Sequence, residues 1–171
     1  MALPTARRKP RGSLVVALLT ALVVVSAARA LAPSFTWNLS PSLPRGLYHL
    51  ESAAPPTRGA IVSFQPPAPA VALIAARAYL PPGASLLKVV VALPGDDVCI
   101  DEVSFRVDGR FVGSVVSRDS AGRALAPFRF CGAVPEGQAF VATRAWLSFD
   151  SRYFGPVPVA SLTVAVPLWT Y

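Results

Sequence analysis

Proline is the residue that most constrains the fold of this chain. The sequence has 18 prolines among 171 residues, and they cluster at residues 55–56, 66–69 and 81–82, between short apolar runs. Because proline fixes φ and lacks a backbone N–H, it ends helices and central strands and is tolerated in turns. Apolar residues make up 53% of the chain, which is enough to bury a core. The pattern therefore favours short strands and loops over a helical bundle.

Most of the apolar runs predict β-strands. Segments rich in β-branched residues or alternating in polarity are typical of strands, and Asp108-Gly109 between two such runs is a strong hairpin signal. One segment, residues 70–80, is rich in Ala and Leu and stops at two prolines, so it predicts a short helix. The expected fold is mostly β with one short helix; the strands are expected within residues 58–67, 85–96, 104–116, 138–149 and 159–169.

A basic tail, residues 1–12, precedes an apolar segment, residues 13–32, whose uncharged core is about 15 residues long. Two interpretations fit. The segment is a cleaved signal peptide, for which "ARA" at 28–30 supplies a small-x-small site, or a retained transmembrane signal anchor. We favour the anchor. In both cases the positive N-terminus stays in the cytoplasm and residues 33–171 are exported.

The net charge of +7 does not predict nucleic-acid binding, because its placement is unsuitable. Four of the basic residues lie in the tail, and residues 13–171 hold twelve Lys/Arg against nine Asp/Glu, a net of +3. These twelve are scattered, without a basic stripe or interleaved aromatic residues. We expect no nucleic-acid partner.

The two cysteines, Cys99 and Cys131, are expected to form a disulfide, because the predicted compartment is oxidising. Closing a loop of about 33 residues would contribute roughly 3–4 kcal/mol on the chain-entropy model. Two cysteines and a single histidine make a poor zinc site, and the sequence has no glycine-rich phosphate loop. We therefore expect neither a metal nor a cofactor.

Lys88 is the most informative residue of the sequence. The chain has 14 arginines and two lysines, and the other lysine, Lys9, lies in the basic tail. Lys88 is flanked by "SLL" and "VVVAL", in a strand that we expect to be buried. Arginine cannot lose its proton in a protein, whereas a desolvated lysine can. The pattern favours a general base; the alternatives are a lysine that reaches the surface or one that pairs with Asp96 or Asp97.

A neutral lysine can activate a serine, and Ser42 lies in the proline-rich stretch "NLSPSLPRGLY", residues 38–48. On its own this stretch also fits an ordinary turn-rich linker. Pro41 and Pro44 restrict the backbone on both sides of Ser42, and Gly46 permits a turn. The single histidine, His49, has no special context, and we expect a surface or packing role for it.

Three motifs in order resemble the signal peptidase superfamily, and within it the TraF-type conjugative-transfer peptidases. They are "SLPRGLY", which contains Ser42, "LLKVVVALPGD", which contains Lys88, and "SFDSRYFGPVP" near the end of the chain. The resemblance covers most of residues 36–167. It implies a signal-peptidase/LexA-like β fold with a small β cap, at roughly residues 99–140, that the cysteines hold.

The resemblance also implies roles for the site residues. Ser42 matches the nucleophile and Lys88 the general base. Ser40 matches a hydroxyl that stabilises the oxyanion together with the Ser42 backbone N–H. Ser148 matches a serine that orients the lysine, and Asp150 and Arg152 match a buried supporting pair. The chain departs from the housekeeping enzyme at Pro41, at Val89 after the lysine, and in its short cap.

The function expected from these observations is that of a membrane-anchored Ser/Lys endopeptidase. We expect it in the inner membrane with its catalytic domain in the periplasm, processing membrane-bound precursors, above all the pilin precursor of a conjugation or type IV secretion system. Cyclising the product and merely trimming it both remain open. The alternatives are a general signal peptidase and a non-catalytic exported β-protein of the transfer apparatus. A self-cleaving LexA-type repressor is a further alternative, but the export segment counts against it.

Overall fold

The computed structural model describes residues 11–31 and 34–171. Contacts divide the chain into two compact units, residues 1–35 and residues 36–171. The first unit contains the helix α1 (Arg11–Leu31). Ala, Leu and Val fill most of this helix, and the Thr20 hydroxyl donates a hydrogen bond to the Val16 carbonyl oxygen one turn earlier.

Helix α1 overlaps the segment expected to cross a membrane. In the described part of the chain, no helix is both long enough and apolar enough for such a span. The helical conformation agrees with the expectation, but the transmembrane span is not confirmed. The basic residues 7–9 of the tail lie outside the described residues.

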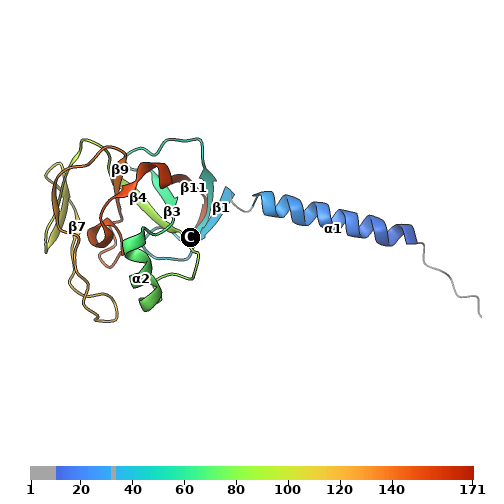
Figure 1. The fold of residues 1–171 in the computed structure, drawn as a ribbon, viewed down its shortest axis with the longest axis horizontal. Coiled ribbons are helices and arrows are strands. Elements are labelled where there is room, and N and C mark those ends of the chain that lie inside the picture. The colour runs from blue at the N-terminus through green and yellow to red at the C-terminus, as the bar shows by residue number, and fades with distance from the viewer. Residues whose placement is uncertain (1–10, 32–33) are drawn as a thin grey trace, which may run out of the picture. The chain divides into compact units, whose positions relative to one another are not determined.

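The second unit is built on a seven-stranded sheet (Figure 1). The neighbouring strands whose register is described run antiparallel to each other. Lys88 lies opposite Val62 near the middle of the sheet. The strands follow in the order β1 (Phe35–Asn38), β2 (Gly46–Glu51), β11 (Thr163–Thr170), β3 (Ile61–Phe64), β4 (Leu86–Ala92), β9 (Gln138–Ala142) and β10 (Val157–Pro158).

The residues between β4 and β9 in the sequence form a smaller four-stranded sheet, which we call the cap sheet. Its order is β7 (Arg110–Ser114), β6 (Ser104–Val107), β5 (Asp97–Ile100) and β8 (Phe130–Ala133). Asp108 and Gly109 both have positive φ, 50° and 71°, which suits the tight turn of the predicted β6–β7 hairpin. The hairpin prediction is confirmed.

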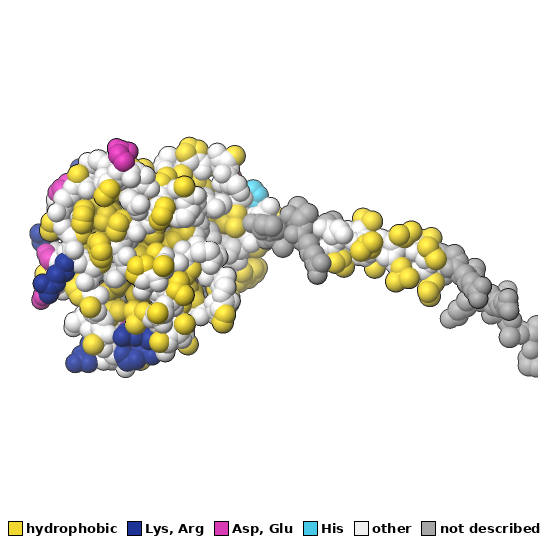
Figure 2. Space-filling view, viewed as in Figure 1, with side chains coloured by type: hydrophobic (Ala, Val, Ile, Leu, Met, Phe, Trp, Pro, Cys, Tyr) yellow, Lys and Arg dark blue, Asp and Glu magenta, His cyan; other side chains and the backbone are white. Residues whose placement is uncertain are grey.

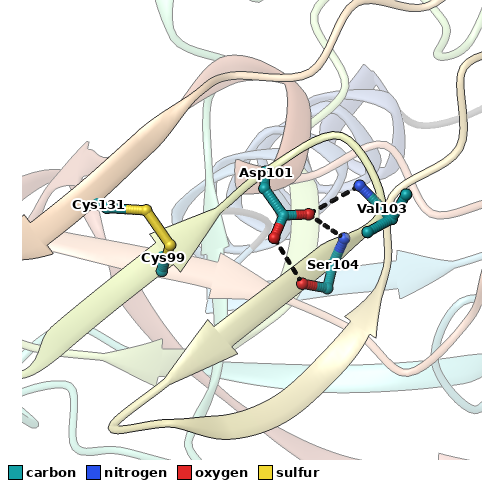
Figure 3. The surroundings of a disulfide bond; sticks show 5 residues. All are labelled: Cys99, Asp101, Val103, Ser104 and Cys131. Atoms are coloured by element: carbon teal, nitrogen blue, oxygen red, sulfur yellow. Dashed lines mark hydrogen bonds between the residues drawn. A yellow bond between two sulfur atoms is a disulfide. The ribbon is translucent and has the colours of Figure 1, made fainter.

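The structure contains the expected disulfide between Cys99 and Cys131. The two residues lie directly opposite each other on β5 and β8 (Figure 3), with their Cα atoms 4.0 Å apart. Beside it, the Asp101 carboxylate accepts hydrogen bonds from the backbone N–H groups of Val103 and Ser104 and from the Ser104 hydroxyl. These bonds fix the turn between β5 and β6.

Short helices cover parts of the larger sheet. The helix predicted over 70–80 is α2 (Ala68–Arg77), so it begins two residues earlier and ends three residues earlier than expected. Its C-cap, Ala78, has the left-handed backbone conformation, and the two prolines follow at 81 and 82. Helix α3 (Ser151–Phe154) and the 3-10 helix η2 (Val159–Ser161) follow β9. Two expectations are corrected. The strand predicted over 138–149 ends at Ala142, and turns follow it. The strand predicted over 159–169 begins only at Thr163, because η2 takes up its first residues.

The apolar side chains form two main cores. One lies between the larger sheet and α2 and includes Val62, Phe64 and Ile74; the other joins the larger sheet to the cap sheet and includes Phe105 and Phe140. Figure 2 shows that hydrophobic side chains also cover much of one exposed face of residues 36–171, while the charged side chains visible there lie toward its margins.

Gly46 has a different role from the one expected. It begins β2 with φ of 145°, opposite Thr170 of β11. A Cβ at this position would collide with the carbonyl oxygen of Trp169. The glycine is therefore required by the close approach of β11 to this strand rather than by a turn.

Candidate active site

The loop that carries Ser42 connects β1 to β2, and hydrogen bonds to the Asn38 side chain hold it in place. The buried Asn38 side-chain amide donates to the carbonyl oxygens of Ser40, Leu43 and Pro44 at 3.0–3.1 Å. Its Oδ1 accepts from the Ser40 backbone N–H at 3.0 Å. One side chain thus binds the backbone on both sides of Ser42.

Tyr48 supports the same loop from β2. Its side chain is fully buried, and its hydroxyl donates to the Pro44 carbonyl oxygen at 2.7 Å. Burial raises the pKa of the Tyr48 hydroxyl, so the group remains a donor. Asn38 and Tyr48 therefore fix the serine loop, with Pro41 and Pro44 restricting its φ angles. The sequence interpretation assigned no role to Asn38 or Tyr48.

Lys88 projects from the centre of β4 and is 4% exposed. Its Nζ donates to Ser148 Oγ at 2.8 Å and to Ser42 Oγ at 3.3 Å. The structure therefore brings together three residues from distant parts of the sequence. Asp96, proposed above as an alternative partner of the lysine, instead accepts from the Leu93 N–H and lies near Arg58.

Ser40 lies within hydrogen-bond distance of the candidate nucleophile. Its Oγ is 2.9 Å from Ser42 Oγ and accepts from the Ser42 backbone N–H at 3.2 Å. Both donors of the expected oxyanion site are thus adjacent, but here they are bonded to each other. A substrate carbonyl would have to displace the Ser40 oxygen from this N–H before both groups could donate to it.

Asp150 and Arg152 form a fully buried ion pair near Lys88 and Ser148. Arg152 Nε and Nη2 donate to the two carboxylate oxygens of Asp150 at 2.8 Å and 2.6 Å. The remaining guanidinium hydrogens reach the carbonyl oxygens of Ser114, Thr143 and Ala145. The pair thereby ties the segment leading to Ser148 to strand β7 of the cap sheet.

The surroundings of Lys88 favour its neutral form. Burial lowers the pKa of Lys88 from its ordinary value of 10.5 to about 8; the charge of Asp150 opposes this shift and that of Arg152 adds to it. At pH 7 a group with this pKa is neutral in roughly a tenth of the molecules. An ordinary lysine would be neutral in fewer than about one in a thousand.

Two cavities meet at Ser42, which among the described residues is the one that lines both. The lysine-side cavity, about 380 Å³, is lined by Lys88 and Ser148, by apolar residues of α2 and β4, and by the β7–β8 connection. The hairpin-side cavity, about 560 Å³, is lined by Leu43 and Pro44, by β4, and by residues of the β6–β7 hairpin. A peptide passing over Ser42 could therefore be held on both sides of its scissile bond.

The single histidine lies outside this arrangement. His49 lines neither cavity, and its Nδ1 lies 3.9 Å from Glu51 on the same strand. Within residues 11–31 and 34–171, no group of three or more His, Cys, Asp or Glu side chains is arranged to hold a metal ion.

Comparison with known families gives the class of protein. The family described as "Signal peptidase, peptidase S26" matches residues 9–169, and the chain therefore belongs to this family of peptidases. The conjugal transfer protein TraF of Agrobacterium tumefaciens (strain 15955) is 40% identical over 164 residues, covering 88% of this chain and 92% of the relative. The probable conjugal transfer protein TraF of Sinorhizobium fredii (strain NBRC 101917 / NGR234) is 36% identical over 180 residues, covering 98% and 95%.

The plasmid transfer protein TraF of Escherichia coli is 34% identical over 147 residues, covering 78% of this chain and 82% of the relative. Among solved structures, a signal peptidase I from Enterococcus faecalis V583 is 28% identical, covers 63% of this chain and 92% of its own, and has a TM-score of 0.37. The expected resemblance to signal peptidases and to TraF proteins is confirmed by the family match and the relatives.

Proposed function

We propose that this chain is a serine endopeptidase in which Ser42 is the nucleophile and Lys88 the general base, and that it processes exported precursor proteins. The observation that carries the proposal is the buried lysine amine bonded to both Ser42 Oγ and Ser148 Oγ. Within a family of peptidases, an amine with a lowered pKa beside a serine hydroxyl is the chemistry that activates such a nucleophile.

The reaction follows from this geometry. Neutral Lys88 accepts the proton of Ser42 Oγ as the oxygen attacks the scissile carbonyl carbon. The Ser42 backbone N–H and the Ser40 hydroxyl turn to the oxyanion of the tetrahedral intermediate. The intermediate collapses, the C–N bond breaks, and the leaving amine takes the proton from Lys88. Lys88 then takes a proton from a water or an incoming amine as this attacks the acyl carbon. When the ester C–O bond breaks, Lys88 returns that proton to Ser42 Oγ, and the free enzyme is restored. Ser148 keeps the lysine amine directed at Ser42 throughout.

The substrate that we propose is the pilin precursor of a conjugative transfer or type IV secretion system. The support is that the relatives described above are conjugal or plasmid transfer proteins, together with the peptidase family. We also propose that residues 36–171 act in the periplasm, at the inner membrane. The basic tail before an apolar segment and the disulfide support this location.

Mass spectrometry of a co-expressed pilin precursor tests the function. Wild-type protein is expected to shorten the precursor, and the Ser42→Ala variant is expected to leave it intact. The product mass separates a linear peptide from one that has lost one water by cyclising. If both proteins leave the pilin precursor intact but the wild type shortens unrelated secreted precursors, the general signal peptidase is the correct alternative. If the wild type cleaves neither the pilin precursor nor the unrelated precursors, the non-catalytic β-protein is the correct alternative.

The pH dependence of turnover reports on Lys88. Because only the neutral amine accepts the serine proton, kcat/KM is expected to rise about tenfold per pH unit below the pKa and to level off above about pH 8. The measurement is the initial rate on a precursor-derived peptide from about pH 6 to about pH 10. A rate that is flat or falls across this range would contradict a lysine base.

A further inference from the structure

The hairpin-side cavity carries positive charge that the mechanism above does not use. Arg58, Arg110 and Arg144 line this cavity of about 560 Å³, and no Asp or Glu of the described chain lines it. Ser42 lies on the same lining. Three arginines without an acidic neighbour on the cavity wall produce a positive field beside the candidate nucleophile.

Arg58 is already paired and forms a fixed part of the wall. Its Nη2 donates to Asp108 Oδ2 at 2.8 Å, and its Nη1 lies 3.7 Å from Asp96 Oδ1. Its Nε donates to the Val91 carbonyl oxygen at 3.0 Å. Two carboxylates therefore offset the charge of Arg58, and the positive field of the cavity comes from the other two arginines.

Arg110 and Arg144 reach the cavity from different elements. Arg110 begins β7 in the cap sheet, and Arg144 follows the end of β9 by two residues. Both residues are exposed, and neither forms a salt bridge with any residue that the structure describes. The pKa of Asp108 is lowered first by the hydrogen bond from Arg58, and the charge of Arg110 has a smaller effect. The cavity thus holds two guanidinium groups without a bonded carboxylate.

The chemistry of the lining suits a carboxylate. The remaining residues are mainly apolar, among them Leu43, Val107, Phe111 and Val112. Apolar walls lower the local dielectric, so a charge-assisted hydrogen bond is stronger there than on an open surface. The planar guanidinium of arginine matches a carboxylate through two parallel hydrogen bonds. Among the groups of a peptide, a carboxylate is therefore the best match for this cavity.

The position of the cavity indicates which molecule supplies the carboxylate. Ser42 lines both cavities, whereas Lys88 lines only the lysine-side cavity. A peptide whose scissile carbonyl lies at Ser42 would extend into the hairpin-side cavity on one side of that bond. An extended chain spans about 3.3–3.6 Å per residue, so the residues that enter a cavity of this size are about the first three.

We propose that Arg110 and Arg144 bind a carboxylate of the precursor within about three residues of the scissile bond, and that they make this peptidase selective for substrates that are acidic on one side of the cleavage site. The carboxylate has two sources: an acidic side chain, or the free C-terminus of a precursor that is cleaved close to its end. The inference rests on the proposed function, because it assigns the hairpin-side cavity to the substrate of Ser42.

Peptide cleavage tests the inference. The first probes span the pilin-precursor cleavage site, have amidated C-termini, and carry Glu, Gln or Lys in turn at each of the three positions on either side of the bond. Gln keeps the shape of Glu and removes its charge. If a side chain is the source, the wild type is expected to have a kcat/KM at least about tenfold higher for Glu than for Gln at one or more positions on one side.

A second set of probes distinguishes the two sources. Peptides with Gln at the tested positions, ending one, two or three residues after the bond, are made with a free carboxylate or an amide at the C-terminus. A preference of at least about tenfold for the free carboxylate assigns the site to the end of the precursor chain. If neither the side chain nor the chain end produces a preference, the proposal is wrong.

Variants of the two arginines show whether they cause the preference. Replacing both, Arg110→Gln with Arg144→Gln, is expected to reduce it to less than about twofold. Arg110→Glu with Arg144→Glu is expected to reverse it, so that the Lys or amide peptide is cleaved faster than the carboxylate peptide. A general loss of structure or activity cannot produce this reversal. An equal fall for all peptides, or a preference that survives both double variants, would overturn the proposal.

The matched control removes the same charge from the same hairpin. Arg106 lies on β6, is exposed and lines neither cavity at Ser42. Arg106→Gln therefore lowers the net charge as each single arginine variant does, and it is expected to leave the preference unchanged. If Arg106→Gln reduces the preference as much as Arg110→Gln does, general attraction to a basic protein explains the result and the site is refuted.

Binding separates this inference from the function on which it rests. In Ser42→Ala protein, fluorescence anisotropy measures the affinity for peptides labelled at the N-terminus without turnover. If the wild type cleaves none of the peptides, the proposed function fails on them, and the affinities decide this inference alone. Binding of the carboxylate peptides at least about tenfold more tightly, with loss of the difference in the double Gln variant, supports the site. Equal binding of all peptides, or binding of none, refutes it.

Discussion

Replacing Lys88 with arginine is expected to lower kcat/KM on a cleaved precursor peptide by at least about 10³-fold, because arginine keeps the positive charge but cannot give up its proton. The Lys88 amine contacts both Ser42 and Ser148, so the substitution removes the proposed base without removing the proposed nucleophile. The measurement is single-turnover cleavage of the peptide at about pH 8, with circular dichroism to show that the variant is folded. Residual activity within about tenfold of wild type would mean that Lys88 is not the base.

Lys88→Met separates loss of chemistry from loss of structure. Its activity is expected to be lost as well, yet its stability is expected to rise. The pKa of Lys88 is about 8 in the folded protein against an ordinary 10.5, so the unfolded chain holds the proton more tightly and the buried charge is unfavourable. This destabilisation is fully present below about pH 8 and disappears as the pH rises toward 10.5. At pH 7 urea denaturation is expected to show a free energy of unfolding about 1–3 kcal/mol above wild type.

Arg152→Met is expected to have the largest effect on stability, lowering the free energy of unfolding by about 3–5 kcal/mol. The change leaves the Asp150 carboxylate buried without its ionic partner, and it removes the hydrogen bonds that Arg152 donates to the carbonyl oxygens of Ser114, Thr143 and Ala145. Urea denaturation with a two-state fit measures the loss. The matched control is Arg129→Met, which breaks an exposed pair with Glu102 and is expected to change the stability by less than about 1 kcal/mol.

The same variant also tests the electrostatics of the base. The charge of Arg152 lowers the pKa of Lys88 and that of Asp150 raises it. Any Arg152→Met protein that remains folded is therefore expected to reach half-maximal kcat/KM at a higher pH than wild type. A shift to lower pH would contradict the proposed influence of the buried pair on the lysine.

Local sequence patterns were sufficient to predict several features of this fold. The Asp108-Gly109 pair specifies its own turn, because both residues tolerate positive φ. Lys88 stood out because it is a lysine in an arginine-rich chain and because its apolar neighbours predict burial. In both cases the information lies within a few residues of the feature.

Other features depend on distant partners and could not be predicted in this way. Asn38 reads as a loop residue, and its role is visible only once β1 has placed its amide beneath the serine loop. Gly46 reads as a turn glycine, but the atom that excludes a side chain belongs to Trp169, more than a hundred residues later. Asp119 lies in "RDSAGR", an ordinary turn sequence. Its hydrogen-bond partners Arg77 and Tyr79 come about 40 residues earlier, and three strands of the cap sheet separate them from Asp119 in the sequence.

The pairing of β5 with β8 sets how the cap sheet is attached to the rest of the chain. Asp97 lies opposite Ala133, so the backbone leaves the larger sheet and returns to it at neighbouring points, and the disulfide closes the intervening residues into a covalent ring. A segment whose entry and exit are adjacent can change length in its exposed loops without altering the register of the strand that carries Lys88. A protease cut within the ring would leave both fragments joined through sulfur. Both ends of the cap sheet would then stay beside the larger sheet, where the cap packs against Phe140 and bonds to Arg152.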